Sequence, residues 1–588
     1  MKKSKSKNPV LFFILCGIVL GALETILVNK GLNYIIPLGE SAGFFITAAI
    51  VDAALMVMLA VILYILPFTC RLSRPLGMIL LAVCVIGLIT AIIQPGRKPV
   101  IAQAFADINK PNIILITLDT AGRKHISLYG YHRNTTPNLD RISAEGVVFN
   151  QAVSPSPWTL PGHACMFTGL LPSEHGATWR SQYLASSVRT LAEVLTEKGY
   201  HTAGFVCGPF CGGEFGLDQG FQFYDEQLGS LKIKLYSVRI IDKIWGLLEG
   251  ETGSNHIKRF LSQLEGYPKY GKRPADLVNK RVLHRMNGKN PDTPYFLFVN
   301  YFDPHQPFII KPPYDTLFTQ KYKPSPSDTL MKWHHQYEPE RRKYINGESM
   351  PAEFLARQKA FEELGCDLYD ALIYFMDEKM NELLIELRKM GLLDNTYIII
   401  TADHGEGLGE HRQWGHYTLY DEILLVPLVI IGPGIPSGVK VDKQVTTMNL
   451  YHTILRLLQI ENESFIEEKS LSFLWEDTTL SGGEPVYGQF YMDTNLVEQF
   501  GGRFDNDAVM LRIPEMKLII KSDGIREKYG LLSDPEEVNN IIDSASYTNL
   551  DTLLENFYDI SMEYIDDVQG HVIDAETREK LKAVGYMK

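Results

Sequence analysis

Beyond about residue 99 the chain alternates short apolar runs with segments of helical periodicity. The runs NIILITLD, YFLFVNYFDPH and TYIIITADHGE begin at Asn112, Tyr295 and Thr396 and are typical of buried strands. PNLDRISAEGV predicts a helix closed by Gly146, TLAEVLTEKGYHTAGFV a helix followed by a strand, and DALIYFMDEKMNELLIELRKMGLL a longer helix. This alternation predicts an α/β fold, a sheet with connecting helices.

The first hundred residues have a different pattern, with three long apolar runs at about residues 9–28, 42–68 and 76–94. Each run reaches the roughly 18 to 20 residues that a helix needs to cross a bilayer, and one cleaved signal peptide does not account for three of them. Basic residues precede the first run and separate the second from the third: Lys2, Lys3, Lys5, Lys7, Arg71 and Arg74. The positive-inside rule then predicts a multi-pass protein of the cell membrane, with the lipid bilayer as a partner, a cytoplasmic N-terminus and an extracytoplasmic remainder.

The length and the net charge of the chain bear on its domain organisation and on its partners. A chain of 588 residues exceeds what one hydrophobic core usually supports. We expect a membrane domain (1–98), a linker (99–110), a catalytic core (111–440) and a C-terminal subdomain (441–588), in which EPVYGQF, DAVMLRI and MKLIIKS alternate like antiparallel strands. The net charge of −12 argues against a nucleic-acid partner. Cys207 and Cys211 are expected to form a local disulfide or to remain free thiols.

Residues that can bind a metal ion follow three of the predicted strands. Asp119 ends the first strand, Asp303 and His305 follow the second, and Asp403 and His404 follow the third. Sites in open α/β sheets gather at the carboxyl ends of the strands. A single Asp after a strand is most often a helix cap, but capping does not explain three carboxylates with two histidines. Oxygen ligands with an imidazole indicate a divalent cation such as calcium, magnesium, manganese or zinc.

The segment SPSPWTLPGHACMFTG, residues 154–169, adds a hydroxyl to this set. Thr159 follows Trp158 and precedes Pro161 and Gly162, which favour a rigid turn that lifts the hydroxyl above the end of the sheet. Metal coordination lowers the pKa of a hydroxyl and makes it available as a nucleophile. In the alternative interpretation Thr159 caps a helix through HACMFTG, and the two roles are compatible.

Six stretches together resemble the sulfatase family of the alkaline-phosphatase superfamily: NIILITLDT, YGYHRNTTPNLDRISAEGVVFNQAVS, PWTLPGHACMFTGLLPSEHG, NYFDPHQPF, YIIITADHGEGLGEHRQWGHYTLYDEILLVPLVI and REKLKAVGYM. The resemblance runs from about residue 110 to the C-terminus. It implies an alkaline-phosphatase-like mixed sheet flanked by helices, with a small C-terminal α+β subdomain. It also implies that Asp119, Asp403 and His404 are metal ligands and that Thr159 occupies the nucleophile position.

Two further histidines match the family's substrate-contacting positions. His305 in DPHQP matches a histidine that contacts the anionic group of the substrate, and His416 stands where many sulfatases have a lysine. We expect both to bind anionic oxygens, and one of them to give a proton to the leaving alcohol. His163 is expected either to tune Thr159 or to make a structural hydrogen bond.

The chain departs from the family pattern at the nucleophile and beside the first metal ligand. Family sulfatases carry a Cys or Ser, then x-Pro-x-Arg, and oxidise that side chain to formylglycine. Thr159 and His163 occupy those positions here, so formylglycine should not form. Asp119 is followed by Thr120 instead of a second aspartate, and Lys124 lies where related sequences often have an acid. This pattern is similar to membrane-anchored phosphodiesterases, phosphoethanolamine transferases and lipoteichoic acid synthases.

We therefore expect a metal-dependent hydrolase or transferase that acts on phosphoesters of an envelope lipid or glycan through a covalent Thr159 ester. Water or an alcohol can attack a phosphothreonine, whereas a sulfothreonine lacks the elimination that a formylglycine hydrate allows. The alternatives are a sulfuric ester hydrolase that works without formylglycine and a non-catalytic membrane-anchored binding protein. One divalent cation is expected; in an alternative arrangement a second is held by Asp303, His305, His411 and His416.

Overall fold

The computed structural model describes residues 110–226, 273–287, 293–310, 312–319, 326–476, 484–492, 504–544, 546 and 548–566. All of them belong to the second of the two units into which the chain divides, residues 102–588. The fold below is that of this unit.

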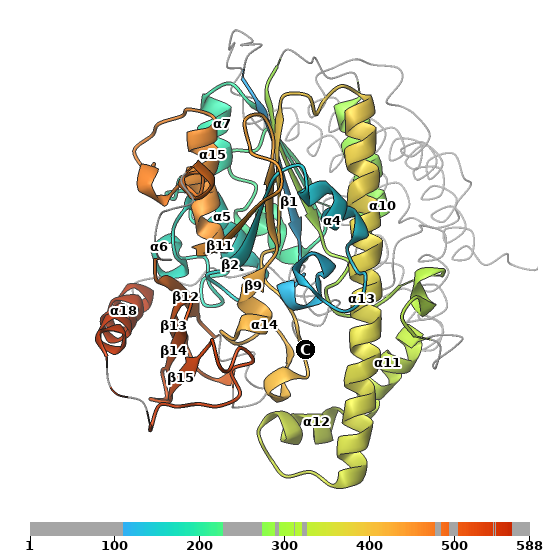
Figure 1. Ribbon diagram of the computed structural model, residues 1–588, viewed down its shortest axis with the longest axis vertical. Helices are drawn as coiled ribbons and strands as arrows, with labels where there is room; N and C mark the ends of the chain where they lie inside the picture. The colour runs from blue at the N-terminus through green and yellow to red at the C-terminus, as the bar shows by residue number, and fades with distance from the viewer. Residues whose placement is uncertain are drawn as a thin grey trace, which may run out of the picture. The chain divides into compact units, whose positions relative to one another are not determined.

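Nine of the described strands form a mixed sheet in the order β11-β2-β10-β6-β1-β5-β3-β4, with β9 paired to β2 (Figure 1). Neighbours from β4 to β6 run parallel, whereas β10 is antiparallel to both β6 and β2. The strands are β1 (Asn112–Leu118), β2 (Val147–Val153), β3 (His201–Val206), β4 (Phe223–Glu226), β5 (Tyr295–Tyr301), β6 (Thr396–Thr401), β9 (Leu425–Val426), β10 (Leu428–Ile431) and β11 (Val439–Thr446).

The three predicted apolar runs are β1, β5 and β6, and they are neighbours at the centre of the sheet. Every residue of β5 and β6 is buried, and in β1 only Asn112 is partly exposed. Strands buried on both faces read as continuous apolar runs, which is why the sequence identified them. Because all three run parallel, their carboxyl ends meet at one edge of the sheet.

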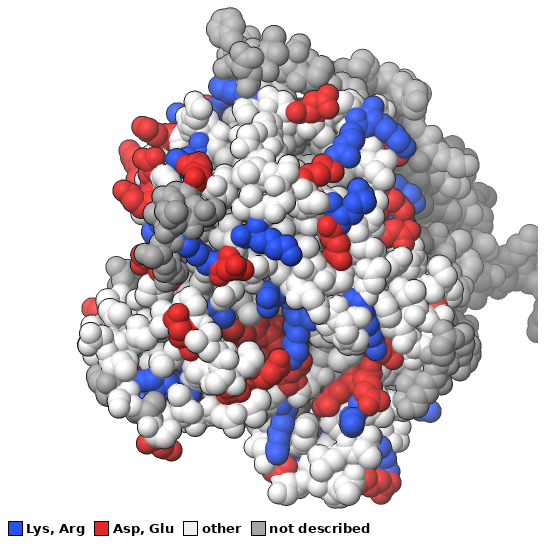
Figure 2. Space-filling view, in the orientation of Figure 1, with Lys and Arg blue, Asp and Glu red and all other residues white. Residues whose placement is uncertain are grey.

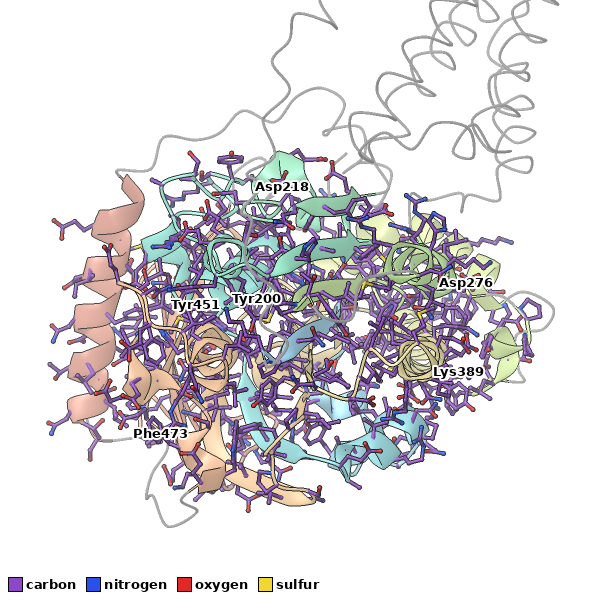
Figure 3. The ribbon with its side chains drawn as sticks, turned by 90° about the horizontal axis from the view of Figure 1, so that it is seen from above. Tyr200, Asp218, Asp276, Lys389, Tyr451 and Phe473 are labelled. Atoms are coloured by element: carbon purple, nitrogen blue, oxygen red, sulfur yellow. The ribbon has the colours of Figure 1, made fainter. Side chains whose placement is uncertain are left out.

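Helices cover both faces of this sheet (Figure 1). On one face lie α5 (Thr159–Thr168), α7 (Leu191–Glu197) and α15 (Leu450–Leu457); on the other lie α4 (Pro137–Ser143), α10 (Ala275–Met286) and α13 (Ala352–Lys389). Seen from above, Tyr200 and Tyr451 mark the first side, and Asp276 of α10 and Lys389 of α13 mark the second (Figure 3). The remaining helices are α6 (Pro172–His175), α11 (Pro326–Gln336), α12 (Glu338–Ile345), α14 (Asp421–Leu424), α16 (Phe473–Glu476) and α18 (Asn549–Asp566).

Most predicted elements are confirmed, and the main difference concerns α13. The sequence predicts this helix over residues 370–393, but it begins at Ala352 and spans 38 residues. The additional turns bury Phe354, Phe361 and Leu368 against the rest of the unit, so tertiary packing extends the helix. It ends before Gly391, whose φ of +72° lies in the left-handed region that glycine adopts at helix ends.

The predicted C-terminal strands form a second, antiparallel sheet. Its order is β12-β13-β14-β15, and α18 packs against it through a small apolar cluster that includes Leu511, Leu518 and Leu554. The strands are β12 (Val486–Phe490), β13 (Ala508–Ile513), β14 (Met516–Lys521) and β15 (Arg526–Gly530). The strands alternate with turns as the sequence predicts, although β15 is not recognisable as a strand from its polar sequence REKYG.

A buried ion cluster joins this second sheet to the first. Lys517 of β14 is fully buried, with Nζ 2.5 Å from Asp421 Oδ1 and 2.8 Å from Glu537 Oε1. Arg512 of β13 donates two hydrogen bonds to Asp421 Oδ2, from Nη2 at 2.8 Å and from Nε at 3.1 Å. Asp421 is the first residue of α14, so these contacts fix the segment that precedes β9 and β10.

Exposed charged side chains contribute less to the stability of the fold than the buried ion cluster does. Lysine, arginine and carboxylate side chains are interspersed over the face shown in Figure 2, and exposed pairs such as Arg388 with Glu145 are screened by solvent. Removing one partner from a buried cluster leaves an unpaired charge in a poorly solvated site. The buried contacts of Lys517 and Arg512 with Asp421 therefore contribute more to attachment of the C-terminal sheet than the exposed pairs do.

The predicted membrane spans, at about residues 9–28, 42–68 and 76–94, lie outside the described residues. In the part of the chain that the structure describes, no helix is both long and apolar enough to cross a bilayer. Even α13 places charged residues such as Lys379 and Glu386 between its buried ones, as an amphipathic helix that packs on protein does. The helices that the structure describes therefore do not support the predicted location in the cell membrane with an extracytoplasmic catalytic part.

Replacing Lys517 with Met should lower the free energy of unfolding by about 3–5 kcal/mol, because Glu537 loses its ion pair with Lys517 and Asp421 is left with Arg512 alone. Urea unfolding of purified protein measures this change. The matched control is Lys440→Met at an exposed position of β11, which should change stability by no more than about 0.5 kcal/mol. Equal effects of the two substitutions would contradict the anchoring role of Lys517.

Candidate metal centre and nucleophile

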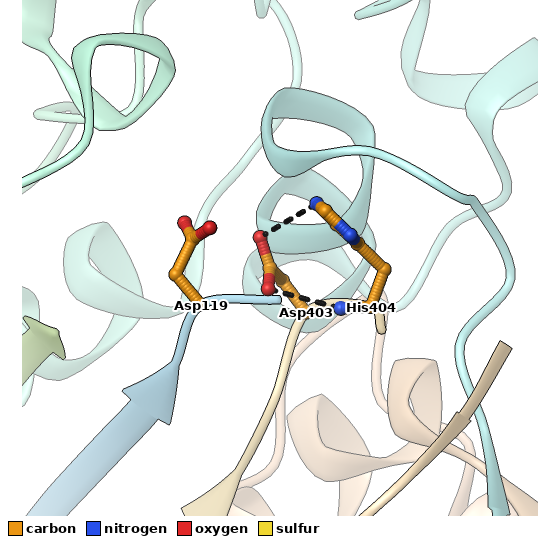
Figure 4. Close-up of side chains that lie close together, drawn as sticks. All are labelled: Asp119, Asp403 and His404. Atoms are coloured by element: carbon orange, nitrogen blue, oxygen red, sulfur yellow. Dashed lines mark hydrogen bonds and ion pairs between the residues drawn. The ribbon is translucent and has the colours of Figure 1, made fainter. Parts of the chain in front are cut away.

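The parallel central strands bring three predicted metal ligands together. Asp119 directly follows β1, and Asp403 and His404 follow β6. Each of the three offers an atom within 4.8 Å of the others, and none is exposed (Figure 4). Among the described residues this is the one group of three or more His, Cys, Asp or Glu side chains with such spacing.

Two carboxylate oxygens of this group have no hydrogen-bond partner, although both are buried. They are Asp119 Oδ1 and Asp403 Oδ2. His404 Nδ1–H donates to the carbonyl of Gly405 at 2.8 Å, so Nε2 carries the lone pair and lies 3.4 Å from Asp403 Oδ2. Two unsatisfied carboxylate oxygens and one imidazole lone pair fit a divalent cation.

The electrostatics of the group agree with a cation site. Burial, and then the charge of Asp403, raises the pKa of Asp119 well above its usual range. Burial acts in the same direction on Asp403, but His404, His163 and two backbone amides outweigh it and lower its pKa. Burial lowers the pKa of His404 to about 3, so this imidazole is neutral, as a metal ligand must be.

A strained residue holds Asp403 in place. Thr120 has φ of +59°, a left-handed conformation that is unfavourable for a β-branched residue. In this conformation its N–H donates to Asp403 Oδ1 at 3.1 Å, and its carbonyl accepts from the hydroxyl of Tyr369 on α13. The Thr120 hydroxyl donates to the Asp119 carbonyl at 2.7 Å, so it is used within the turn.

Thr159 lies beside this group, at the first position of α5. Its Oγ1 is 3.4 Å from His404 Nε2 and its side chain is buried. Trp158 is the N-cap residue, and it makes no side-chain cap bond, so the Thr159 hydroxyl is not the helix cap. A β-carbon at Gly162 would lie 3.1 Å from the carbonyl oxygen of Asp403, so a glycine allows α5 to approach the end of β6 this closely.

His163 supports the turn through hydrogen bonds at both nitrogens of its ring. Its Nδ1–H donates to the Thr159 carbonyl at 2.8 Å, and its Nε2 accepts from Thr117 Oγ1 at 2.9 Å. Burial lowers its pKa, so the ring is neutral. Asn300 continues the network, because its Nδ2 donates to Thr117 Oγ1 at 3.1 Å and lies 3.5 Å from Asp119 Oδ2. The sequence analysis missed Asn300; the signal was a polar residue inside the fully apolar run YFLFVNYF.

The two histidines expected at the substrate lie next to the metal group. The ring centroid of His416 is 4.3 Å from that of His404 and 5.2 Å from that of His305. His416 Nδ1–H points to Glu406 Oε1 at 3.3 Å, and His305 Nδ1–H donates to the Gln306 carbonyl at 2.6 Å. Glu406 therefore contacts His416 and the Gln306 carbonyl contacts His305; neither residue was predicted from the sequence.

Other candidate residues have different surroundings. Asp303 Oδ1 accepts from the first amide of α10 at 3.3 Å, as a helix-capping carboxylate does. His411 bonds to Glu422 and to the Glu537 carbonyl, away from the group of Asp119. Lys124 pairs with Glu410 and Glu536, and Cys207 and Cys211 are buried free thiols.

Comparisons with known proteins identify the family to which this chain is similar. Residues 111–460 match the sequence model of a family described as Sulfatase. A sulfatase of Formosa agariphila is 24% identical over 511 residues, covering 83% of this chain and 94% of that protein. An N-acetylglucosamine-6-O-sulfatase of Bacteroides thetaiotaomicron is 23% identical over 537 residues, covering 80% and 88%. A phosphonate monoester hydrolase of Agrobacterium radiobacter shares the fold, with a TM-score of 0.57 and 20% identity over 77% of this chain and 96% of that one.

Divalent metal should raise the melting temperature of the protein, and Asp119→Asn should abolish that response. A ligand that binds only the folded state at 100 times its Kd stabilises by about 3 kcal/mol. The same substitution should stabilise the chelator-treated protein, because it removes one of two repelling buried carboxylates. Thermal scans with chelator and with added calcium, magnesium, manganese or zinc test the loss of the metal response and the stabilisation of the chelator-treated variant. Metal analysis of the purified proteins gives the occupancy.

His404→Ala should also lower the metal content. Asp377→Asn is the matched control, because Asp377 is a buried carboxylate that accepts bonds from the first turn of α4 at 2.8 and 2.9 Å. It should leave the metal response unchanged. A purified protein that contains no metal and shows no thermal response to any of the four cations would contradict the site.

His411 predicts a pH dependence of stability. Both ring nitrogens face acceptors, Glu422 Oε1 at 2.9 Å and the Glu537 carbonyl at 3.1 Å, so both must donate and the ring is an imidazolium. Burial lowers the pKa of His411, but Glu422 and the Glu537 carbonyl outweigh burial and raise it above 6.5. A raised folded-state pKa gives stability that is complete below the unfolded value and is lost as the pH rises through the folded value.

His411→Gln should therefore lower the melting temperature more at pH 6 than at pH 9. Paired thermal scans of wild type and variant over this range measure the difference. His284→Gln, at an exposed position of α10, should give a difference that does not depend on pH. Parallel curves for wild type and His411→Gln would show that His411 is not charged in the folded protein.

Proposed function

Because the chain belongs to the sulfatase family and is a sulfatase-like hydrolase, we propose that it cleaves phosphoesters through a covalent ester on Thr159. The observation that carries this proposal is a buried threonine hydroxyl at the start of α5, 3.4 Å from His404 Nε2. A hydroxyl nucleophile needs activation, and this one lies beside the residues that fit a cation.

The nucleophile position excludes the usual sulfatase chemistry. The oxidation that gives formylglycine acts on a Cys or Ser followed by x-Pro-x-Arg, whereas this chain has Thr159, Leu160, Pro161, Gly162 and His163. Cys165, the nearest following thiol, is buried within α5 and its Sγ lies 3.4 Å from His175 Nε2, so it does not replace Thr159. The threonine hydroxyl is thus the group available for attack.

Asp119, Asp403 and His404 would hold the divalent cation that enzymes of this family bind. When bound, such a cation neutralises charge on the oxygens of the substrate and lowers the pKa of a neighbouring hydroxyl. The start of α5 contributes in the same direction, since the N-terminal end of a helix favours negative charge.

The reaction of a phosphodiester has two steps. In the first, Thr159 Oγ1 attacks phosphorus, the bond from phosphorus to the leaving oxygen breaks, and the leaving alcohol takes up a proton. In the second, water attacks phosphorus, the bond to Thr159 breaks, and the threonine hydroxyl is restored with a phosphomonoester as product. An alcohol in place of water gives a transferred phosphodiester, so the same intermediate serves a hydrolase or a transferase.

His305 and His416 would bind the two non-bridging oxygens of the phosphate. Their rings lie 5.2 Å apart between centroids, and His416 also lies against the metal ligand His404. Either imidazole can donate a hydrogen bond to an anionic oxygen or a proton to the leaving alcohol. His163 would support the Thr159 turn through the carbonyl bond rather than take part in proton transfer.

The preference for phosphorus over sulfur follows from the fate of the intermediate. A sulfated formylglycine hydrate collapses by elimination, but a sulfated threonine has no second hydroxyl from which elimination could start. A phosphothreonine can be attacked directly at phosphorus. The substrate would be a phosphodiester whose alcohol part is a sugar, in a glycan or a glycolipid, since a relative acts as an N-acetylglucosamine-6-O-sulfatase.

Metal-loaded protein should hydrolyse bis(p-nitrophenyl) phosphate and p-nitrophenyl phenylphosphonate faster than p-nitrophenyl sulfate, since all three release the same alcohol. Thr159→Ala should lower kcat/KM by at least about 10³-fold, as removal of a nucleophile does. Mass spectrometry of wild type quenched during turnover of bis(p-nitrophenyl) phosphate should find an added p-nitrophenyl phosphoryl group on the peptide that contains residues 154–169.

Thr168→Ala is the matched control, because Thr168 is a buried threonine of the same helix whose hydroxyl donates to the Ala164 carbonyl at 2.7 Å. It should retain turnover. Full activity of Thr159→Ala would refute the covalent mechanism. Cleavage of the sulfate ester alone would instead favour a sulfuric ester hydrolase without formylglycine, and no turnover of any ester with metal present would favour a non-catalytic binding protein.

A further inference from the structure

We propose that Gln306 is a positioning residue that orients both His305 and His416 toward the substrate. The role rests on the proposed function of those two histidines. Gln306 belongs to a chain of side chains, Trp414, Gln306, Glu406 and His416, which is called the Gln306 network below. None of the hydrogen bonds in this network involves Asp119, Asp403 or His404.

The backbone of Gln306 holds the first histidine. Its carbonyl accepts from His305 Nδ1–H at 2.6 Å. The His305 ring is stacked on Phe302, with centroids 4.3 Å apart and planes 19° apart. Phe302 therefore fixes the plane of the His305 ring, and the backbone carbonyl of Gln306 fixes the direction of Nδ1 within that plane.

The side chain of Gln306 holds the second histidine through Glu406. Glu406 Oε1 accepts from Gln306 Nε2 at 3.2 Å and from His416 Nδ1 at 3.3 Å. Gln306 Oε1 accepts from Trp414 Nε1 at 2.8 Å. An indole N–H only donates and a carboxylate only accepts, so the two partners together dictate which end of the amide faces which side.

Trp414 gives the network a rigid support on α13. Its ring centroid lies 4.5 Å from that of Phe361 on α13 and 5.9 Å from that of Phe308. The guanidinium of Arg341 on α12 lies over Phe361 at 4.2 Å and over Trp414 at 5.6 Å. A β-carbon added at Gly365 of α13 would come within 2.1 Å of the Trp414 ring, so the indole lies directly against the helix.

These contacts connect α13 to the substrate side of the metal group. Trp414 packs against α13 and so determines the orientation of the Gln306 amide. That amide in turn orients Glu406 and, through Glu406, the ring of His416. Glu406 is buried, so its orientation is determined by these protein partners and not by solvent. Loss of one link should disturb the spacing of the two histidines without removing a metal ligand or the nucleophile.

Gln306→Met should raise the KM for bis(p-nitrophenyl) phosphate and weaken the binding of inorganic phosphate, each by about 10- to 100-fold, the cost usual for supporting contacts of a site. It keeps the length of the side chain and removes both of its hydrogen bonds. Calorimetric titration of the metal-loaded protein with inorganic phosphate gives the second readout. The metal content should stay at the wild-type value.

Gln358→Met is the matched control. Gln358 is a buried glutamine on α13 whose Nε2 donates to Glu362 Oε1 at 2.8 Å, outside the Gln306 network. It should leave the KM and the phosphate affinity within twofold of wild type. Gly365→Ala, which has to displace Trp414, should reproduce the effect of Gln306→Met from a position with no contact to either histidine.

A paired substitution separates positioning from a general loss of structure. Gln306→Glu alone places two carboxylates together and should impair phosphate binding. Adding Glu406→Gln restores complementary partners, because the new amide can donate to the new carboxylate and still accept from His416 Nδ1–H. Recovery of phosphate affinity in the double variant, at a melting temperature matching that of the single variant, would support positioning.

The outcomes distinguish this proposal from the proposed function. Unchanged KM and phosphate affinity in Gln306→Met, or no recovery in the double variant, would overturn the role of Gln306 even if Thr159→Ala is inactive. Full activity of Thr159→Ala would overturn the covalent mechanism, while the phosphate titrations would still report on the Gln306 network.

Discussion

Two buried carboxylates that face one another at the edge of the sheet are the constraint on which the site depends. Asp119 and Asp403 each keep an oxygen without a hydrogen-bond partner, and burial with mutual repulsion raises the pKa of Asp119. Such an arrangement is unfavourable unless a cation is shared between them. The strained Thr120 turn and the close approach of α5 at Gly162 both serve to hold this unfavourable pair in one geometry.

Elements distant in the sequence stabilise that edge from two sides. The long helix α13 contributes Tyr369, which bonds to both the Thr120 carbonyl and the Gly122 amide, and it supports Trp414 of the Gln306 network. The C-terminal sheet contributes Lys517, whose contacts with Asp421 fix the segment that follows His416. A strained site needs such external supports, because its own residues gain little from the conformation they adopt.

Thr159 and His163 differ from the residues that the family pattern has at these two positions, although the fold is that of the family. Thr159 has a hydroxyl where the family pattern has a Cys or Ser, and His163 makes two structural hydrogen bonds where that pattern has an arginine. Because His163 is neutral and buried, the positive charge facing an anionic substrate would come from the cation. The first turn of α5 is thus less basic than the family pattern predicts.

The sequence determined the central strands, most flanking helices and the group of Asp119, Asp403 and His404, because buried parallel strands read as apolar runs and their carboxyl ends share one edge. It did not reveal the first turns of α13, the strand β15 or the roles of Asn300, Gln306 and Glu406, since these depend on contacts between residues far apart in the chain. Apolar runs alone also led to a membrane location that the described helices do not support. Periodicity reports which face of an element is buried; only the tertiary structure decides what that face packs against.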